Sequence, residues 1–345
     1  MTGELAPGSA APGEARRPGA RLLLVANLDA EIEMARAATP GPHPDVRPEV
    51  ARLIARAGSH MAALGRPGDA LWLPAAIPQG ELAPAARELA IATGPLPPAQ
   101  AILPWAVTGA VERHGAPVFG GGASAEVARR VNHRGFSFAL AEARSWALPG
   151  ARVVRDVAEI ERHLAAGGAA AGGGRWIVKA PYSAAGRERL RQTGASLGRG
   201  AAARAERLLA RFGELLFEPW VERVADLACT GRAGEGEVVY PPHRLVTDER
   251  GVFRAAVIDD AGDPAVPPGE HRAVRQAAEE VAGALAAAGY RGPFGIDAFL
   301  WRDPRTGAVR LQRASEINAR LTFGLLARAA AERAGVAGGR FELRL

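Results

Sequence analysis

The sequence predicts a protein of mixed α/β and α+β class, in which a parallel α/β domain comes first and an α+β unit follows. Three observations support this prediction. Up to about residue 120, short apolar runs typical of buried strands alternate with segments of helical apolar spacing. An Ala/Gly tract at 165–174, which we expect to be a variable loop, then interrupts the chain. Beyond it, strand-like runs follow one another and end in a long hairpin.

The first domain is predicted to span residues 21–122. Its expected strands are 21–26, 70–74 and 101–104, with a further apolar run at 117–119, and its expected helices are 50–64 and 105–114. The glycines at 120–122 lack the GxGxxG spacing and an acidic partner, so a flexible turn is a better interpretation than a dinucleotide-binding loop. Residues 1–20 contain no periodic apolar pattern and no signal-peptide core, which predicts a disordered tail.

The second unit is predicted to span residues 123–345. A helix is expected at 123–147 and is ended by the Leu-Pro-Gly at 148–150. The later expected strands are 175–180, 215–220, 238–240, 243–247 and 252–258, and the later helices are 200–212 and 271–288.

Composition limits the functional classes. Hydrophobic residues make up 48% and charged residues 23%, as in a folded soluble domain. A net charge of +6 and a pI near 10.4 would fit a nucleic-acid binder. However, the 43 basic residues are one lysine and 42 arginines scattered among acidic residues, without an aromatic-interleaved basic stripe. We therefore expect no nucleic-acid partner.

The compartment is predicted from cysteine content and hydropathy. Cys229 is the single cysteine, which excludes an internal disulfide and a Cys-rich zinc site, and its apolar neighbours indicate a buried residue rather than a nucleophile. No apolar run is long enough to span a bilayer. These features favour a cytoplasmic protein without a membrane partner, and they leave the oligomeric state open.

Two segments suggest nucleotide binding. The strand 176–181 contains the only lysine, Lys179, and a turn-rich loop at 183–187 follows it, an arrangement suited to polyphosphate oxygens. The strand 215–222 ends in a polar, proline-marked hinge that could offer backbone groups to adenine and a carboxylate to ribose. An ordinary strand end explains this second segment equally well.

The third segment is a hairpin, with strands at 292–301 and 309–320 joined by a turn at 303–307. Strand periodicity places Glu316, Asn318 and Arg320 on one face, and the fold-back brings Asp297 beside Glu316. The 19 positions between these carboxylates (316 minus 297) call for a bulge if they are to pair. Two carboxylates and an amide oxygen suit Mg²⁺. A solvated charged edge is the alternative, but charges placed inside apolar runs argue against it.

Residues 125–330 resemble the ATP-grasp superfamily in the order of their segments. The order is a lysine strand with a small-residue loop, a glutamate hinge, a Gly-Ile-Asp strand and a final Glu-Ile-Asn-Ala-Arg. The preceding domain is similar to that family's pre-ATP-grasp domain. The resemblance implies a two-lobed ATP-grasp fold, with a small lobe at 150–222 and a large lobe at 223–345. It also implies ATP and Mg²⁺, or Mn²⁺ in its place, as cofactors.

The resemblance also implies a role for each matching residue. Lys179 would contact the phosphates and, with Arg320, serve catalysis; Ser183, Gly186 and Arg187 would belong to the covering loop; Glu218 and Val221 would lie at adenine, Glu222 or Asp226 at ribose; and Asp297, Glu316 and Asn318 would hold the metal. Where many relatives have a second phosphate-binding lysine, this chain has Arg134.

The activity implied by the resemblance is that of an ATP-dependent carboxylate–amine ligase. A small-molecule carboxylate would be activated as an acyl phosphate and then attacked by an amine or similar nucleophile. The sequence contains no HExxH motif or nucleophile triad that would indicate another chemistry. A nucleotide-binding regulatory protein without turnover remains the alternative.

Overall fold

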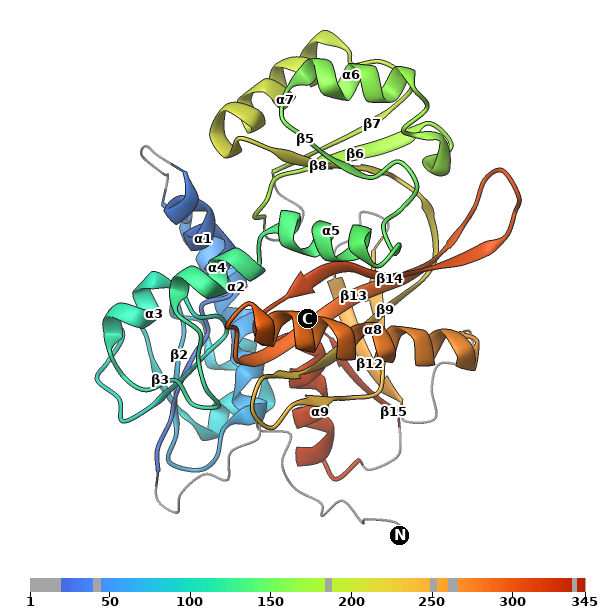
Figure 1. The fold of residues 1–345 in the computed structure, drawn as a ribbon. Helices are drawn as coiled ribbons and strands as arrows, with labels where there is room; N and C mark the ends of the chain where they lie inside the picture. Colours follow the sequence, from blue (N-terminus) through green and yellow to red (C-terminus); the bar gives the residue numbers. More distant parts are fainter. Residues whose placement is uncertain are drawn as a thin grey trace.

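The computed structural model describes residues 20–39, 45–183, 188–248, 253–259, 266–336 and 340–344. Almost all of the predicted tail lies outside the described residues. Three β-sheets organise the described chain (Figure 1). None of the described helices is both long and apolar enough to cross a bilayer.

The first sheet contains four parallel strands in the order β3-β2-β1-β4. Three were expected, but the short strand β3 was not, and the run at 117–119 forms only an isolated bridge from Val118 to Ile102. The elements are β1 (Leu23–Val25), α1 (Ala30–Ala38), α2 (Pro48–Gly58), the 3₁₀ helix η1 (Ser59–Leu64), β2 (Ala70–Trp72), the 3₁₀ helices η2 (Gln79–Glu81) and η3 (Pro84–Glu88), β3 (Ala90–Ala92), β4 (Ile102–Pro104) and α3 (Gly109–His114).

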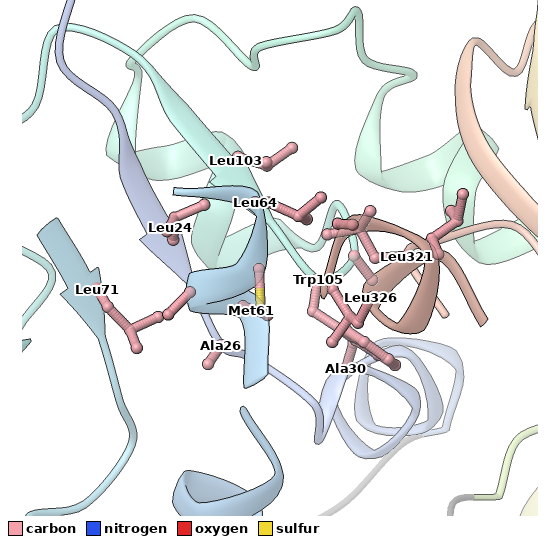
Figure 2. Close-up of a cluster of buried hydrophobic side chains, with 14 of the residues drawn as sticks. Leu24, Ala26, Ala30, Met61, Leu64, Leu71, Leu103, Trp105, Leu321 and Leu326 are labelled. Atoms are coloured by element: carbon pink, nitrogen blue, oxygen red, sulfur yellow. The ribbon is translucent and has the colours of Figure 1, made fainter. Parts of the chain in front are cut away.

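One hydrophobic core joins this first sheet to the C-terminal helix α9 (Phe323–Arg333). Figure 2 shows Trp105, which follows β4, beside Leu321 and Leu326. Leu326 is fully buried, and truncating such a leucine typically costs about 2–5 kcal/mol. The two ends of the described chain are therefore fixed to each other, which positions the end of the predicted hairpin against the first domain.

The single helix predicted at 123–147 is two helices, α4 (Ala125–Val131) and α5 (Arg134–Ala143). The break occurs because Asn132 accepts a hydrogen bond from the Ala319 backbone amide (2.9 Å) and donates one to the Ala319 carbonyl (3.2 Å). His133 then caps the second helix by accepting from the Gly135 amide (3.0 Å). A tertiary contact with the end of the hairpin thus overrides the local helical pattern.

The second sheet is antiparallel, in the order β5-β8-β6-β7. Its core includes Trp176 stacked on Phe217, with ring centroids 5.5 Å apart. The Ala/Gly tract, expected to be a variable loop, packs here: Ala169 is buried and Gly172 lies against the Trp220 backbone, where a Cβ would come within 2.8 Å of the Trp220 nitrogen. The elements are β5 (Arg152–Val154), α6 (Val157–Ala165), the 3₁₀ helix η4 (Ala170–Gly172), β6 (Arg175–Lys179), β7 (Arg189–Thr193), α7 (Arg199–Phe212) and β8 (Leu215–Pro219).

The third sheet has the order β14-β13-β9-β11-β12-β15, with β10 paired to β9. Helix α8 packs against this sheet through Val274, Ala278, Val281 and Leu285, all fully buried as the helical spacing predicts (Figure 1). The elements are β9 (Glu222–Ala233), β10 (Val238–Val239), β11 (His243–Thr247), β12 (Phe253–Asp259), α8 (Pro268–Ala287), β13 (Gly292–Arg302), β14 (Val309–Asn318) and β15 (Arg340–Arg344).

The predicted hairpin is formed by β13 and β14. Asp297 lies directly opposite Glu316, and the register shifts between Asp297 and Phe299. The shift is the irregularity that the spacing required, so both the pairing and the bulge are confirmed. The limits of the two lobes, at residues 150, 222 and 345, stay predictions.

Candidate functional site

A cavity of about 520 Å³ lies where the elements of the three sheets meet. The resemblance named thirteen residues, and two of them, Gly186 and Arg187, lie outside the described residues. Eight of the described ones line this cavity: Arg134, Lys179, Ser183, Asp226, Asp297, Glu316, Asn318 and Arg320. Segments far apart in sequence therefore converge on one cavity.

Lys179 lies at the end of β6, and its Nζ is 2.5 Å from Oε2 of Glu218 on the neighbouring strand β8. Both side chains are largely buried, 18% and 9% exposed. The carboxylate fixes the ammonium at the cavity wall and neutralises it there. Glu218 itself does not line the cavity, and its carboxylate contacts the lysine instead.

Arg134 is the first residue of α5 and connects three parts of the site. Its Nη1 donates to the Ala180 carbonyl (2.6 Å) and to Ser183 Oγ (3.0 Å), at the start of the segment expected to cover ATP. Its Nη2 donates to Glu316 Oε1 (2.9 Å). The guanidinium uses both of its terminal amino groups on protein partners, which its forked arrangement of donors allows.

The paired carboxylates differ in proton affinity. Burial, followed by the charge of Glu316, raises the pKa of Asp297 to about 7, although Arg320 lowers it. Burial alone would raise the pKa of Glu316 too. The charges of Arg134 and Lys179, with that of Arg320, outweigh burial and hold the pKa of Glu316 below its ordinary value. The pair is thus short of positive charge on the Asp297 side.

This charge deficit is where a divalent cation would fit. Among the described residues no cluster of three or more histidine, cysteine or acidic side chains could hold a metal, so an ion here would depend on two carboxylates and the amide of Asn318. In the structure, the Asn318 Nδ2 faces Asp297 Oδ2 (3.5 Å), and its Oδ1 accepts from Arg320 Nη2 (2.9 Å). The amide must turn for its oxygen to join the carboxylates as a ligand.

Arg320 is held by the first domain. Its Nε is 2.6 Å from Glu31 Oε1 on α1, and its guanidinium lies 5.1 Å from the centre of the Trp105 ring. It also donates through Nη1 to the Leu321 carbonyl (3.1 Å). The ion pair is largely buried, with side chains 18% and 13% exposed. The guanidinium is therefore preorganised beside Asn318 by residues that no sequence motif singled out.

Besides Glu218, three residues were expected near adenine and ribose, and the structure places them differently from one another. Asp226 lines the cavity, but one oxygen accepts from Arg223 Nη1 (2.7 Å) and the other from Thr247 Oγ1 (2.7 Å). Val221 is buried in a small core with Phe299 and lies outside the lining. Glu222 is also outside it, at the start of β9 opposite Arg302, with its side chain 63% exposed and 3.5 Å from the Arg302 guanidinium.

Sequence reasoning missed two polar residues deep in the cavity, Thr230 on β9 and His243 on β11. Both are almost fully buried, and neither the threonine hydroxyl nor either ring nitrogen has a hydrogen-bond partner within the described residues. Burial, followed by the charge of Arg328, lowers the pKa of His243 to about 3, so the imidazole is neutral at neutral pH. No sequence motif marks either residue, because it is the pairing of distant strands in the sheet that brings each of them to the cavity.

No protein-family model and no curated protein sequence matches the chain. Solved structures do. N5-carboxyaminoimidazole synthetase from Staphylococcus aureus, complexed with ADP, aligns with 93% of this chain and 78% of its own at 10% identity, with a TM-score of 0.52. N5-carboxyaminoimidazole ribonucleotide synthetase from Thermus thermophilus aligns with 92% of this chain and 80% of its own at 12% identity, also with a TM-score of 0.52.

A third similar structure is pyruvate carboxylase from Rhizobium etli, with a TM-score of 0.56 at 17% identity. The alignment covers 92% of this chain but only 29% of that one. At such identities the likeness establishes the fold and not the reaction. The chain therefore has the ATP-grasp fold, with a pre-ATP-grasp domain at its N-terminus.

Proposed function

We propose that the protein is an ATP-dependent ligase of the ATP-grasp type, which activates a small-molecule carboxylate as an acyl phosphate for attack by an amine or similar nucleophile. One observation supports this most strongly: Asp297 and Glu316 pair across the hairpin and line the same cavity as Lys179 and Arg320. A structurally similar protein is described as an ADP complex of a synthetase, which agrees with nucleotide binding in this cavity.

Each lining residue has a proposed part in this reaction. Asp297, Glu316 and the oxygen of Asn318 would hold Mg²⁺, which when bound neutralises charge on the β- and γ-phosphate oxygens. Lys179 would exchange its contact with Glu218 for a phosphate oxygen. Arg320 would keep its Nε on Glu31 and turn an amino group from Asn318 toward the transferred phosphoryl group.

The proposed bond changes are those of acyl-phosphate chemistry. A carboxylate oxygen attacks the γ-phosphorus and the bond to the β-phosphate oxygen breaks, so that ADP leaves. The nucleophile then attacks the acyl carbon, the carbon–oxygen bond to the phosphoryl group breaks, and inorganic phosphate leaves. Most of the protein's contribution is positioning and charge neutralisation, in line with the absence of a nucleophile triad from the sequence.

The test is a two-dimensional screen in which carboxylic acids are paired with amines, with Mg-ATP present, while ADP and phosphate are measured. Hydroxylamine in place of the amine traps an acyl phosphate as a hydroxamate, which detects the first step alone. We expect carboxylate-dependent ADP formation that disappears in Asp297→Asn. ATP binding without ADP formation over the whole library would contradict the proposal.

One observation favours a second function, nucleotide binding for regulation without turnover. By the resemblance, Arg134 takes the place of a phosphate-binding lysine that many relatives have, and both of its terminal amino groups are used on Ala180, Ser183 and Glu316. A site short of one phosphate contact could bind ATP and turn it over poorly. Saturable ATP binding with no hydroxamate for any carboxylate would favour this function.

A further inference from the structure

One wall of the cavity differs from the rest in its chemistry. It is formed by α1 and α2 of the first domain, and its apolar lining residues are Leu28, Ile32, Val50, Leu53, Ile54 and Ala57. Leu53 is 60% exposed, the most exposed of the large hydrophobic side chains that are not buried in the described structure. An exposed leucine beside a cavity is a surface that a ligand can cover.

The charged groups of this wall are acidic. Glu31 is paired with Arg320, so its charge is already balanced. Asp29, at the N-terminus of α1, makes no side-chain capping bond and no ion pair with a described cation. Burial raises the pKa of Asp29. The charge of Arg36 on the same helix acts on Asp29, but no described cation forms an ion pair with it, so a ligand cation can pair with this partly buried carboxylate.

No arginine of α1 or α2 is among the described residues that line the cavity. Arg320, the nearest basic lining residue, already donates to Glu31, Asn318 and the Leu321 carbonyl. The other basic lining residues come from α5, β6, β7 and β9, across the cavity. A phosphate or carboxylate group held against this wall inside the cavity would therefore meet no basic lining residue of α1 or α2.

We propose that this wall binds the nucleophile, and that the nucleophile is an amine with an apolar body and no anionic group. The ammonium would contact Asp29, and the apolar body would cover Leu53 and its neighbours on α2. This inference rests on the proposed ligase function and narrows it to a substrate class. The proposed substrate differs from a ribonucleotide, the compound in the name of the similar synthetase, because a ribonucleotide carries a phosphate.

Asp29 would also take part in the transfer. The Asp29 carboxylate first takes one proton from the bound ammonium, which frees the lone pair of the nitrogen, and the nitrogen then forms its bond to the acyl carbon. The carbon–oxygen bond of the acyl phosphate breaks, and phosphate leaves with the electron pair and takes the second proton of the nitrogen. A carboxylate with a raised pKa is the better proton acceptor.

The test compares amines once the carboxylate partner is known from the screen. We expect kcat/KM to rise by roughly fourfold for each methylene added to an alkylamine, the factor for burying one methylene group. Amino acids and phosphoethanolamine should be poor nucleophiles. Asp29→Asn and Leu53→Lys should lower kcat/KM for the best amine at least tenfold, whereas the matched controls Asp45→Asn and Ile91→Lys, at exposed positions outside the cavity lining, should not.

Hydroxylamine trapping distinguishes a failure of the proposed ligase function from a failure of the proposed amine-binding wall. Hydroxamate formation together with equal use of anionic and apolar amines, or with no effect of Asp29→Asn and Leu53→Lys, would overturn this inference and leave the ligase function standing. No hydroxamate with any carboxylate would overturn the ligase function, and this inference with it.

Discussion

Replacing Asp297 by asparagine should stabilise the protein at high pH while destroying its response to Mg²⁺. In the structure Asp297 lies opposite Glu316, and burial, then the charge of Glu316, raises its pKa from 3.8 to about 7. The folded protein thus keeps a proton that the unfolded chain releases. Its free energy of unfolding therefore falls as the pH rises from about 4 to about 7, and asparagine removes this loss.

The size of the effect follows from the shift. Each pKa unit corresponds to about 1.4 kcal/mol, so a rise of about 3 units would cost the folded state about 4 kcal/mol above pH 7. Glu316 shares the effect, and solvent in the cavity screens the charge, so we expect the variant to recover roughly 2 kcal/mol. At pH 4, close to the ordinary pKa of 3.8, most of this loss of stability has not yet accumulated, so the two proteins should differ little.

The assay is thermal unfolding of the native protein and of Asp297→Asn at pH 4 and pH 8, without metal and with Mg²⁺ plus ADP. At pH 8 without metal, the variant should melt several degrees higher. Added Mg²⁺ and ADP should stabilise the native protein much more than the variant, because a ligand that binds only the folded state raises its stability. Parallel pH profiles, or equal stabilisation of both proteins by the metal, would refute this account of the pair.

Three further predictions concern the same cavity. Lys179→Met should lower turnover by about 10²–10³, the typical loss for a preorganised charged donor, with a native circular dichroism spectrum; unchanged ATP turnover would exclude the lysine from the site. Asn318→Ala and Glu316→Ala should raise the Mg²⁺ concentration needed for half-maximal turnover, with Asn318→Asp less impaired than Asn318→Ala, and equal Mg²⁺ titrations in all variants would count against these ligands. Glu31→Gln should release Arg320 from its 2.6 Å contact and lower kcat about tenfold or more with little change in ATP affinity. The kcat of Glu31→Asp should lie between those of the native protein and Glu31→Gln. An unaffected kcat in Glu31→Gln would show that Arg320 is not positioned by α1.

The sequence predicted the parts of the site that depend on local patterns. The hairpin and its bulge followed from apolar runs and from the spacing of Asp297 and Glu316, and the structure has both. The scarcity of lysine was informative as well, since the single lysine of the sequence, Lys179, lines the cavity.

The remaining contacts arise from packing between distant segments, for which the sequence has no periodic signal. Glu31 meets Arg320 because α9 and the first sheet share one core. His243 and Thr230 face the cavity through the pairing of β11 and β13 with β9. For the same reason, the pairing of Glu218 with Lys179 could not be foreseen, since it depends on β6 and β8 being neighbours.

The most direct test of the central claim is a crystal structure with Mg²⁺ and a non-hydrolysable ATP analogue. We expect the metal to be bound by Asp297 and Glu316, with the Asn318 amide turned so that its oxygen joins them, and the phosphates within reach of Lys179 and Arg320. A metal bound elsewhere, with the oxygens of Asp297 and Glu316 facing solvent, would contradict the account.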